Sequence, residues 1–125
     1  MKKWLGAAVA ALIVTLPVKA ETQDYKLITV AGYLNFYLLN INACQDFHPE
    51  ARQAAYDAEQ KLYPWLEKLH SKLGDGKQVS EIVLKRRAML NSQIGEGDFT
   101  LDHCQAIIKI LNEDGLDKTL LANLD

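Results

Sequence analysis

The uncharged stretch at residues 27–44, LITVAGYLNFYLLNINAC, decides the fold of this chain. Its apolar side chains recur every three or four residues, as they do along one face of an α-helix: Leu27, Val30, Ala31, Leu34, Leu38 and Ile41. Further apolar and aromatic residues lie on its other faces: Ile28, Tyr33, Phe36, Tyr37 and Leu39. A surface helix keeps one polar face. The stretch therefore predicts a helix that is either central to a helical bundle or half of an interface.

A membrane-spanning helix is the competing interpretation of the same stretch, because roughly 20 apolar residues suffice to cross a bilayer. The stretch is interrupted by four residues that are unfavourable for this role: Gly32, Asn35, Asn40 and Asn42. We therefore expect a helix inside a folded domain.

The first twenty residues differ in composition from the rest and have the pattern of a signal peptide. Met1-Lys2-Lys3 supplies a positive start, residues 4–14 form a short apolar run, and Val18 and Ala20 are small residues before a cleavage site. We predict cleavage after Ala20, which leaves residues 21–125 as a single domain in the periplasm without an integral membrane segment. No cysteine lies at the predicted cleavage site, so a lipid anchor is not expected.

The charge balance excludes nucleic acid as an expected partner. Removal of Lys2, Lys3 and Lys19 leaves 11 Lys and Arg against 16 Asp and Glu, a net charge of −5. Binding to phosphates requires a concentrated basic surface. The one basic run, at residues 85–87, is interpreted as a solvated helix face.

The two cysteines, Cys44 and Cys104, predict one disulfide, because an exported chain with an even number of cysteines meets an oxidising compartment. The bridge would close a loop of 60 residues, which in the chain-entropy model contributes about 4 kcal/mol of stability.

The rest of the chain shows helical periodicity between turn residues and no alternation typical of strands. A second helix is expected from Pro49 to about Leu73 with a kink at Pro64, a third over residues 79–94, and a fourth capped by Thr100. Leucines at 116, 120, 121 and 124 suggest a short last helix whose docking the sequence does not fix. The predicted fold is all-α: a compact four-helix bundle with a short fifth C-terminal helix.

No catalytic, cofactor-binding or metal-binding residues are expected. The three histidines, His48, His70 and His103, do not pair at the spacing of metal ligands, and bridged cysteines can neither coordinate zinc nor attack a substrate. The chain is therefore interpreted as a non-enzyme without a cofactor.

Aromatic residues around the first helix and the proline kink are the candidate partner-binding residues. Tyr33, Tyr37 and Asn40 share one helix face, Phe36 lies beside them, and Trp65 follows the kink. Aromatic rings with a polar tip are enriched at protein interfaces. We expect this face either to mediate self-association, as in a homodimer, or to capture a partner helix.

Two segments give the chain a family resemblance: residues 27–34 leading to Cys44, and residues 103–111, HCQAIIKIL. The arrangement resembles the small pilotins of type II secretion, helical proteins in which a disulfide ties the first helix to the last. The resemblance implies a groove that captures a helical tail of the secretin. Pilotins are typically lipoproteins, whereas this chain has no lipobox cysteine.

The same outline is also similar to periplasmic immunity proteins that neutralise wall-degrading effectors, and residues 43–47 are similar to acid-stress chaperones. The expected function is a non-catalytic, secretion-accessory or pilotin-like protein that binds a protein partner in the cell envelope. An immunity-type inhibitor of a periplasmic effector enzyme, or a periplasmic stress chaperone, is the alternative.

Overall fold

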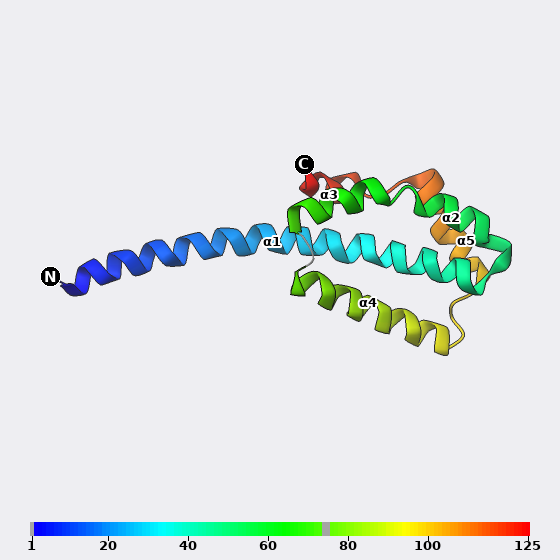
Figure 1. The fold of residues 1–125 in the computed structure, drawn as a ribbon, viewed down its shortest axis with the longest axis horizontal. Coiled ribbons are helices and arrows are strands. Elements are labelled where there is room, and N and C mark those ends of the chain that lie inside the picture. Colours follow the sequence, from blue (N-terminus) through cyan, green and yellow to red (C-terminus); the bar gives the residue numbers. More distant parts are fainter. Residues whose placement is uncertain (1, 74–75) are drawn as a thin grey trace.

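The computed structural model describes the backbone of residues 2–73 and 76–125 and the side chains of residues 25–73 and 76–125. Helix α1 runs from Lys2 to Phe47, and its first part extends beyond the other helices (Figure 1). The helices that pack around its second part are α2 (Arg52–Glu59), α3 (Tyr63–Leu73), α4 (Lys77–Gly95) and α5 (Leu101–Lys109). The chain is thus organised around one long central helix.

The position of α1 explains why residues 27–44 lack charge. Val30, Ala31, Leu34, Ile41 and Cys44 have no exposed surface. The segment Tyr25–Phe47 is long and apolar enough to cross a membrane, with a mean hydropathy of 1.3, yet half of its most apolar window is buried inside the bundle. The prediction of a central helix is confirmed, and the protein core accounts for the apolar character that a membrane would otherwise explain.

The second predicted helix is two helices, which corrects the expectation of one kinked helix over residues 49–73. A 3-10 turn, η1 (Pro49–Ala51), leads into α2, which ends at Glu59. Pro64 has no N–H to donate to the carbonyl of Gln60, so the chain makes a tight turn instead. The amides of Lys61 and Leu62 bond to residues three positions earlier, and Pro64 lies at the second position of α3, where the missing donor costs nothing.

Among the described helices, α4 makes extensive contact only with α1. Gly32 of α1 permits the close approach, since a Cβ there would lie 3.2 Å from Nη2 of Arg86 and 3.9 Å from Cγ2 of Ile82. Leu90 is the one buried residue of α4. The predicted helix over residues 79–94 is confirmed.

Helix α5 begins where the sequence predicts. The Thr100 side chain accepts a 3.2 Å hydrogen bond from the amide of His103 and so caps the helix. A π-helical turn, η2 (Ile110–Asp114), follows and ends at Gly115, whose φ of 78° is readily adopted only by glycine. Residues 116–125, here named the tail, contain α6 (Lys118–Leu121) and the 3-10 turn η3 (Ala122–Leu124).

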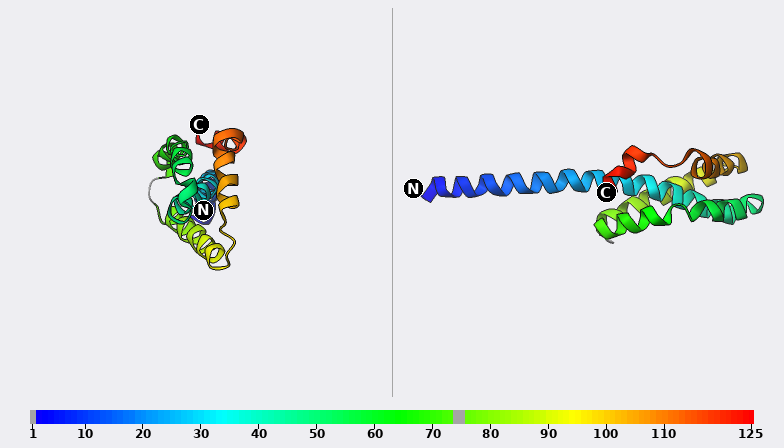
Figure 2. Two further views of the ribbon diagram at one scale, coloured as in Figure 1. Left: turned by 90° about the vertical axis from the view of Figure 1, so that its right-hand side faces the viewer. Right: turned by 90° about the horizontal axis from the view of Figure 1, so that it is seen from above.

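Cys44 and Cys104 are bonded and fully buried, so the disulfide joins the end of α1 to the first turn of α5. Viewed along α1, the helices α2 and α3, the helix α4, and α5 with the tail lie on three different sides of it (Figure 2). The described residues contain no strand. The all-α bundle with one bridge is confirmed, and a disulfide with an apolar N-terminal helix fits an exported protein. The cleavage site at Ala20 lies outside the residues whose side chains are described.

Candidate functional site: a groove between α3 and the tail

A groove of about 440 Å³ separates α3 from the tail. Its size falls in the range of about 300–1,000 Å³ that is usual for binding sites. Residues from three parts of the chain line it: Lys61 and Trp65 near the start of α3, Leu111 and Gly115 around η2, and Leu116, Lys118, Leu121, Ala122 and Asp125 of the tail. One of the predicted partner-binding residues, Trp65, therefore lies in the groove.

The lining is mainly apolar. Leu111 and Leu121 are buried and belong to the hydrophobic core, so the groove opens directly onto the core. Trp65 and Leu116 are half-buried against the same cluster. Pro64 sets the start of α3 and thereby places Trp65, its neighbour, on this side of the helix.

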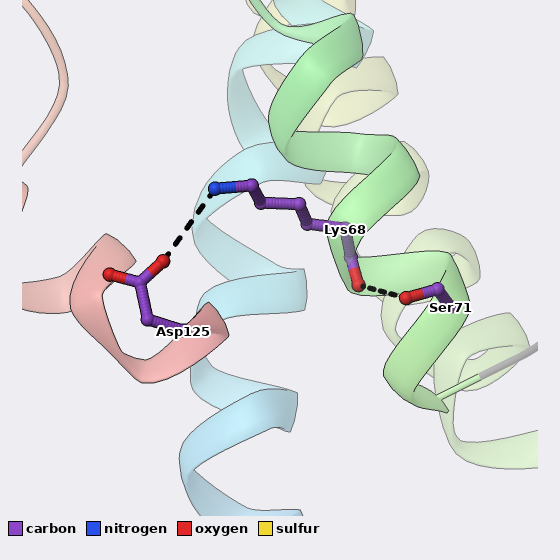
Figure 3. Close-up of polar contacts among 3 residues, drawn as sticks. All are labelled: Lys68, Ser71 and Asp125. Atoms are coloured by element: carbon purple, nitrogen blue, oxygen red, sulfur yellow. Dashed lines mark hydrogen bonds and ion pairs between the residues drawn. The ribbon is translucent and has the colours of Figure 1, made fainter.

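The rim of the groove is basic. Lys61 extends its Nζ to 3.5 Å from the carbonyl oxygen of Asn112. Lys68 places its Nζ 4.9 Å from the centre of the Trp65 ring and 3.6 Å from Oδ1 of Asp125, across the gap between α3 and the tail (Figure 3). Both side chains of this ion pair are at least half exposed, so the pair contributes little to stability.

The tail is held in place by few contacts. The backbone amide of Asp117 donates a 2.8 Å hydrogen bond to the hydroxyl of Tyr33 on α1, and the Asp117 carboxylate caps α6 through the amide of Leu120. Leu121 and Leu124 are the buried anchors, and η3 packs on both α1 and α3. A helix of four residues is not stable alone, so these contacts hold the segment in its conformation.

The predicted partner-binding face on α1 is largely covered. Tyr37 is 9% exposed and Asn40 is 3% exposed, so the structure places these two residues in the core and not on an open contact surface as expected. Burial raises the pKa of Tyr37, and the nearby Tyr33 adds to the rise. The physical reason is that neighbouring helices pack on all sides of α1, including the side with polar aromatic tips.

Tyr33 and Phe36 keep partial exposure. The Tyr33 hydroxyl is occupied by the tail, while Phe36 lines a small pocket of about 100 Å³ between α1 and α4, under the guanidinium of Arg86 at 5.8 Å. For Tyr33, Phe36 and Trp65, binding of a partner stays a prediction. Of these three, Trp65 lines the groove of about 440 Å³.

Two of the histidines contact α1 or the loop before α5. The amide nitrogen of Asn40 donates to the carbonyl of Phe36, so its Oδ1 accepts the 2.8 Å bond from Nε2 of His103. Burial lowers the pKa of His103. Nε2 of His48 lies 2.9 Å from the carbonyl oxygen of Phe99, whose ring is stacked on the imidazole at 5.7 Å. Among the described side chains, no three His, Cys, Asp or Glu residues converge as metal ligands would.

Sequence reasoning missed most of the groove. The sequence gives no sign of a role for Lys61, Lys68 and Lys118, and it does not fix where the tail leucines dock. The available signal was the spacing of Leu121 and Leu124, which marks one apolar face. That spacing identifies a docked segment but not the surface on which it docks.

Comparison with protein-family models, with curated proteins and with solved structures finds no match to this chain. The resemblance to pilotins and to immunity proteins stays a prediction.

Proposed function

We propose that the protein is a non-catalytic protein-binding module of the bacterial periplasm, with a secretion-accessory or pilotin-like role, and that it binds an amphipathic segment of another envelope protein in the groove between α3 and the tail. The observation that carries the proposal is the groove itself: about 440 Å³, open to the core at Leu111 and Leu121, and bordered by lysines. An amphipathic helix binds by placing its apolar face in such a groove.

The shape of the site favours this function over an immunity-type inhibitor. An inhibitor needs a protrusion that fills the active-site cleft of an enzyme, whereas the site proposed here is a groove. The signal-peptide pattern and the disulfide support a role in an oxidising compartment outside the cytoplasm.

The charge of the rim selects the partner. Lys61 and Lys118 line the groove, and Lys68 beside it is paired with Asp125, the one acidic residue of the lining. The bound segment should therefore carry Asp or Glu beside its apolar residues, to face the two lysines and to take the place of Asp125 at Lys68. Such complementary charges mainly increase the rate and the specificity of association.

Site-specific photo-crosslinking in living cells tests the proposal. A photo-reactive amino acid replaces Lys61 in one variant and Lys118 in another, because both side chains are exposed and line the groove. Lys85 is the matched control, an exposed lysine on α4 that lies outside the groove. We expect the same crosslinked envelope protein from positions 61 and 118 and none from position 85.

Mass spectrometry of the crosslinked band identifies the partner and the bound segment. An acidic, amphipathic segment of a secretion component supports the proposal. Equal crosslinking from all three positions, or none from positions 61 and 118, contradicts it, and a band that contains the active site of a wall-degrading enzyme establishes the immunity-type alternative instead.

A further inference from the structure

The tail occupies its site in the manner of a bound peptide. Its helix α6 has four residues, and it is attached to the body of the protein after Gly115. Leu121 and Leu124, three positions apart, enter the core against α1 and α3, and the acidic Asp125 directly after them meets Lys68. The cleft beneath the tail thus already holds a short helical segment with two leucines and a following carboxylate.

The tail fills this cleft incompletely. Protein interiors are packed as densely as organic crystals, yet the groove of about 440 Å³ remains open beside the buried Leu121. Ala122 of η3 and Asp125, the residue after η3, border the groove, and Ala122 presents only a methyl group. A larger apolar side chain at the position of Ala122 would fill the space next to Trp65 and Leu111.

We infer that the tail is an internal ligand that the partner segment displaces, and that this segment contains a leucine, a large apolar residue directly after it, and a second leucine two positions further on that is followed by Asp or Glu. This inference rests on the proposed function, because it names the ligand and the regulation of the same site. The partner outcompetes the tail by taking the place of Leu121 and Leu124 and by filling, in addition, the volume that Ala122 leaves open. Lys118 stays at the edge of the site during this exchange, because it lies close to Gly115, where the tail is attached.

The energetics allow such an exchange. The tail is held by two buried leucines, by the partly buried Leu116 and Leu120, by one hydrogen bond to Tyr33 and by one exposed ion pair. Its helix has only four residues, and short segments with few buried side chains open more readily than the core does. Because the tail is tethered, its effective concentration is in the millimolar range for a short linker, which lowers the apparent affinity of any free competitor.

The test uses the full mature chain and a labelled synthetic peptide with the sequence of residues 117–125, DKTLLANLD, followed by fluorescence anisotropy. The variant Leu121→Asp with Leu124→Asp removes both anchors of the tail. We expect it to bind the peptide at least tenfold more tightly than the wild type does. Asn123→Asp is the matched control, since it adds a charge to the exposed side of the tail and should bind like the wild type.

A second peptide carries Ala122→Leu. It should bind the variant with the undocked tail several-fold more tightly than the native sequence, whereas a peptide with Leu121→Ser and Leu124→Ser should not bind. In the full chain, Ala122→Leu should raise the melting temperature and abolish crosslinking from position 61, while Asn123→Leu should do neither. Equal affinity of both peptides, or an unchanged crosslink in the Ala122→Leu chain, overturns the inference.

The inference is also overturned if the variant with the undocked tail is folded and still binds no peptide. Circular dichroism and the intact disulfide verify that the variant is folded. If the double variant does not fold, Tyr33→Phe with Asp125→Asn removes only the polar ties, and it should bind the peptide more tightly than the wild type; an unchanged affinity contradicts displacement. If the peptide experiments fail but crosslinking from positions 61 and 118 is still observed, the inference about the tail is wrong and the proposed function holds. The failure of the inference is thus distinguishable from the failure of the proposed function. A dimer formed through exchange of tails would identify a second copy as the occupant and overturn the inference of a foreign partner.

Discussion

His103 shows how burial changes the chemistry of one side chain. Its Nε2 donates to Asn40, its ring lies 5.3 Å from the Phe99 ring, and burial lowers its pKa from the usual 6.5. The folded protein therefore favours the neutral imidazole. Its neighbour in sequence is Cys104, so a change of charge at His103 occurs beside the disulfide.

We predict that acid destabilises the protein in part through His103. Because the unfolded chain binds a proton at a higher pH than the folded chain does, stability is complete above pH 6.5 and decreases as the pH falls through the lowered pKa. Melting temperatures at about pH 7.5 and about pH 5 should therefore differ more for the wild type than for His103→Gln. An equal decrease in both proteins would show that other groups cause the acid sensitivity.

We predict that Tyr37→Arg lowers the free energy of unfolding by about 3 kcal/mol or more, because it places an unpaired charge in the core. Tyr25→Arg on the same helix is the control, since Tyr25 is 72% exposed and should tolerate the change. Chemical denaturation measures both. A stable Tyr37→Arg protein would show that this face of α1 is accessible after all.

At the scale of elements, Pro64 and Gly32 decide how the helices are arranged. Pro64 divides the expected second helix into α2 and α3, which lets α3 run beside the tail and places Trp65 in the groove. The turn between them is fixed by Leu62, which is fully buried, and by the Glu59 carboxylate, which accepts bonds from Gln45 of α1 and Tyr63 of α3.

We predict opposite effects for a small and a large side chain at Gly32. Gly32→Ala should stabilise the protein by about 0.5–1 kcal/mol, because alanine favours the helix and only the flexible end of Arg86 must move. Gly32→Leu should cost about 1–3 kcal/mol, because it also displaces Ile82 and with it α4. Gly95→Leu, which meets nothing within 4 Å, is the control for size. Loss of stability in Gly32→Ala would show that α4 is rigidly fixed on α1.

At the scale of the whole molecule, the disulfide and the tail hold distant parts of the chain together. The bridge ties α5 to the end of α1 by a covalent bond, whereas the tail is held against α1 and α3 by non-covalent contacts, chiefly those of Leu121 and Leu124. The two attachments differ in strength, which is consistent with a permanent bundle and a replaceable tail.

We predict that Cys104→Ser lowers the free energy of unfolding by about 4 kcal/mol, the value expected when a bridge across 60 residues is lost. Denaturation of the wild type with and without reductant should reproduce the difference. Alkylation of the unfolded, unreduced protein should modify neither cysteine, and labelling there would show that the bridge does not form in the cell.

The sequence by itself determined the helical class, the central role of residues 27–44, the disulfide and the cap at Thr100. These features follow from local periodicity, from local turn chemistry and from the pairing of the only two cysteines. The groove and the burial of Tyr37 and Asn40 were decided by the tertiary structure alone. Periodicity shows which face of a segment is apolar, but the surface that covers this face, and the volume left open beside a small residue such as Ala122, depend on how helices distant in sequence pack together.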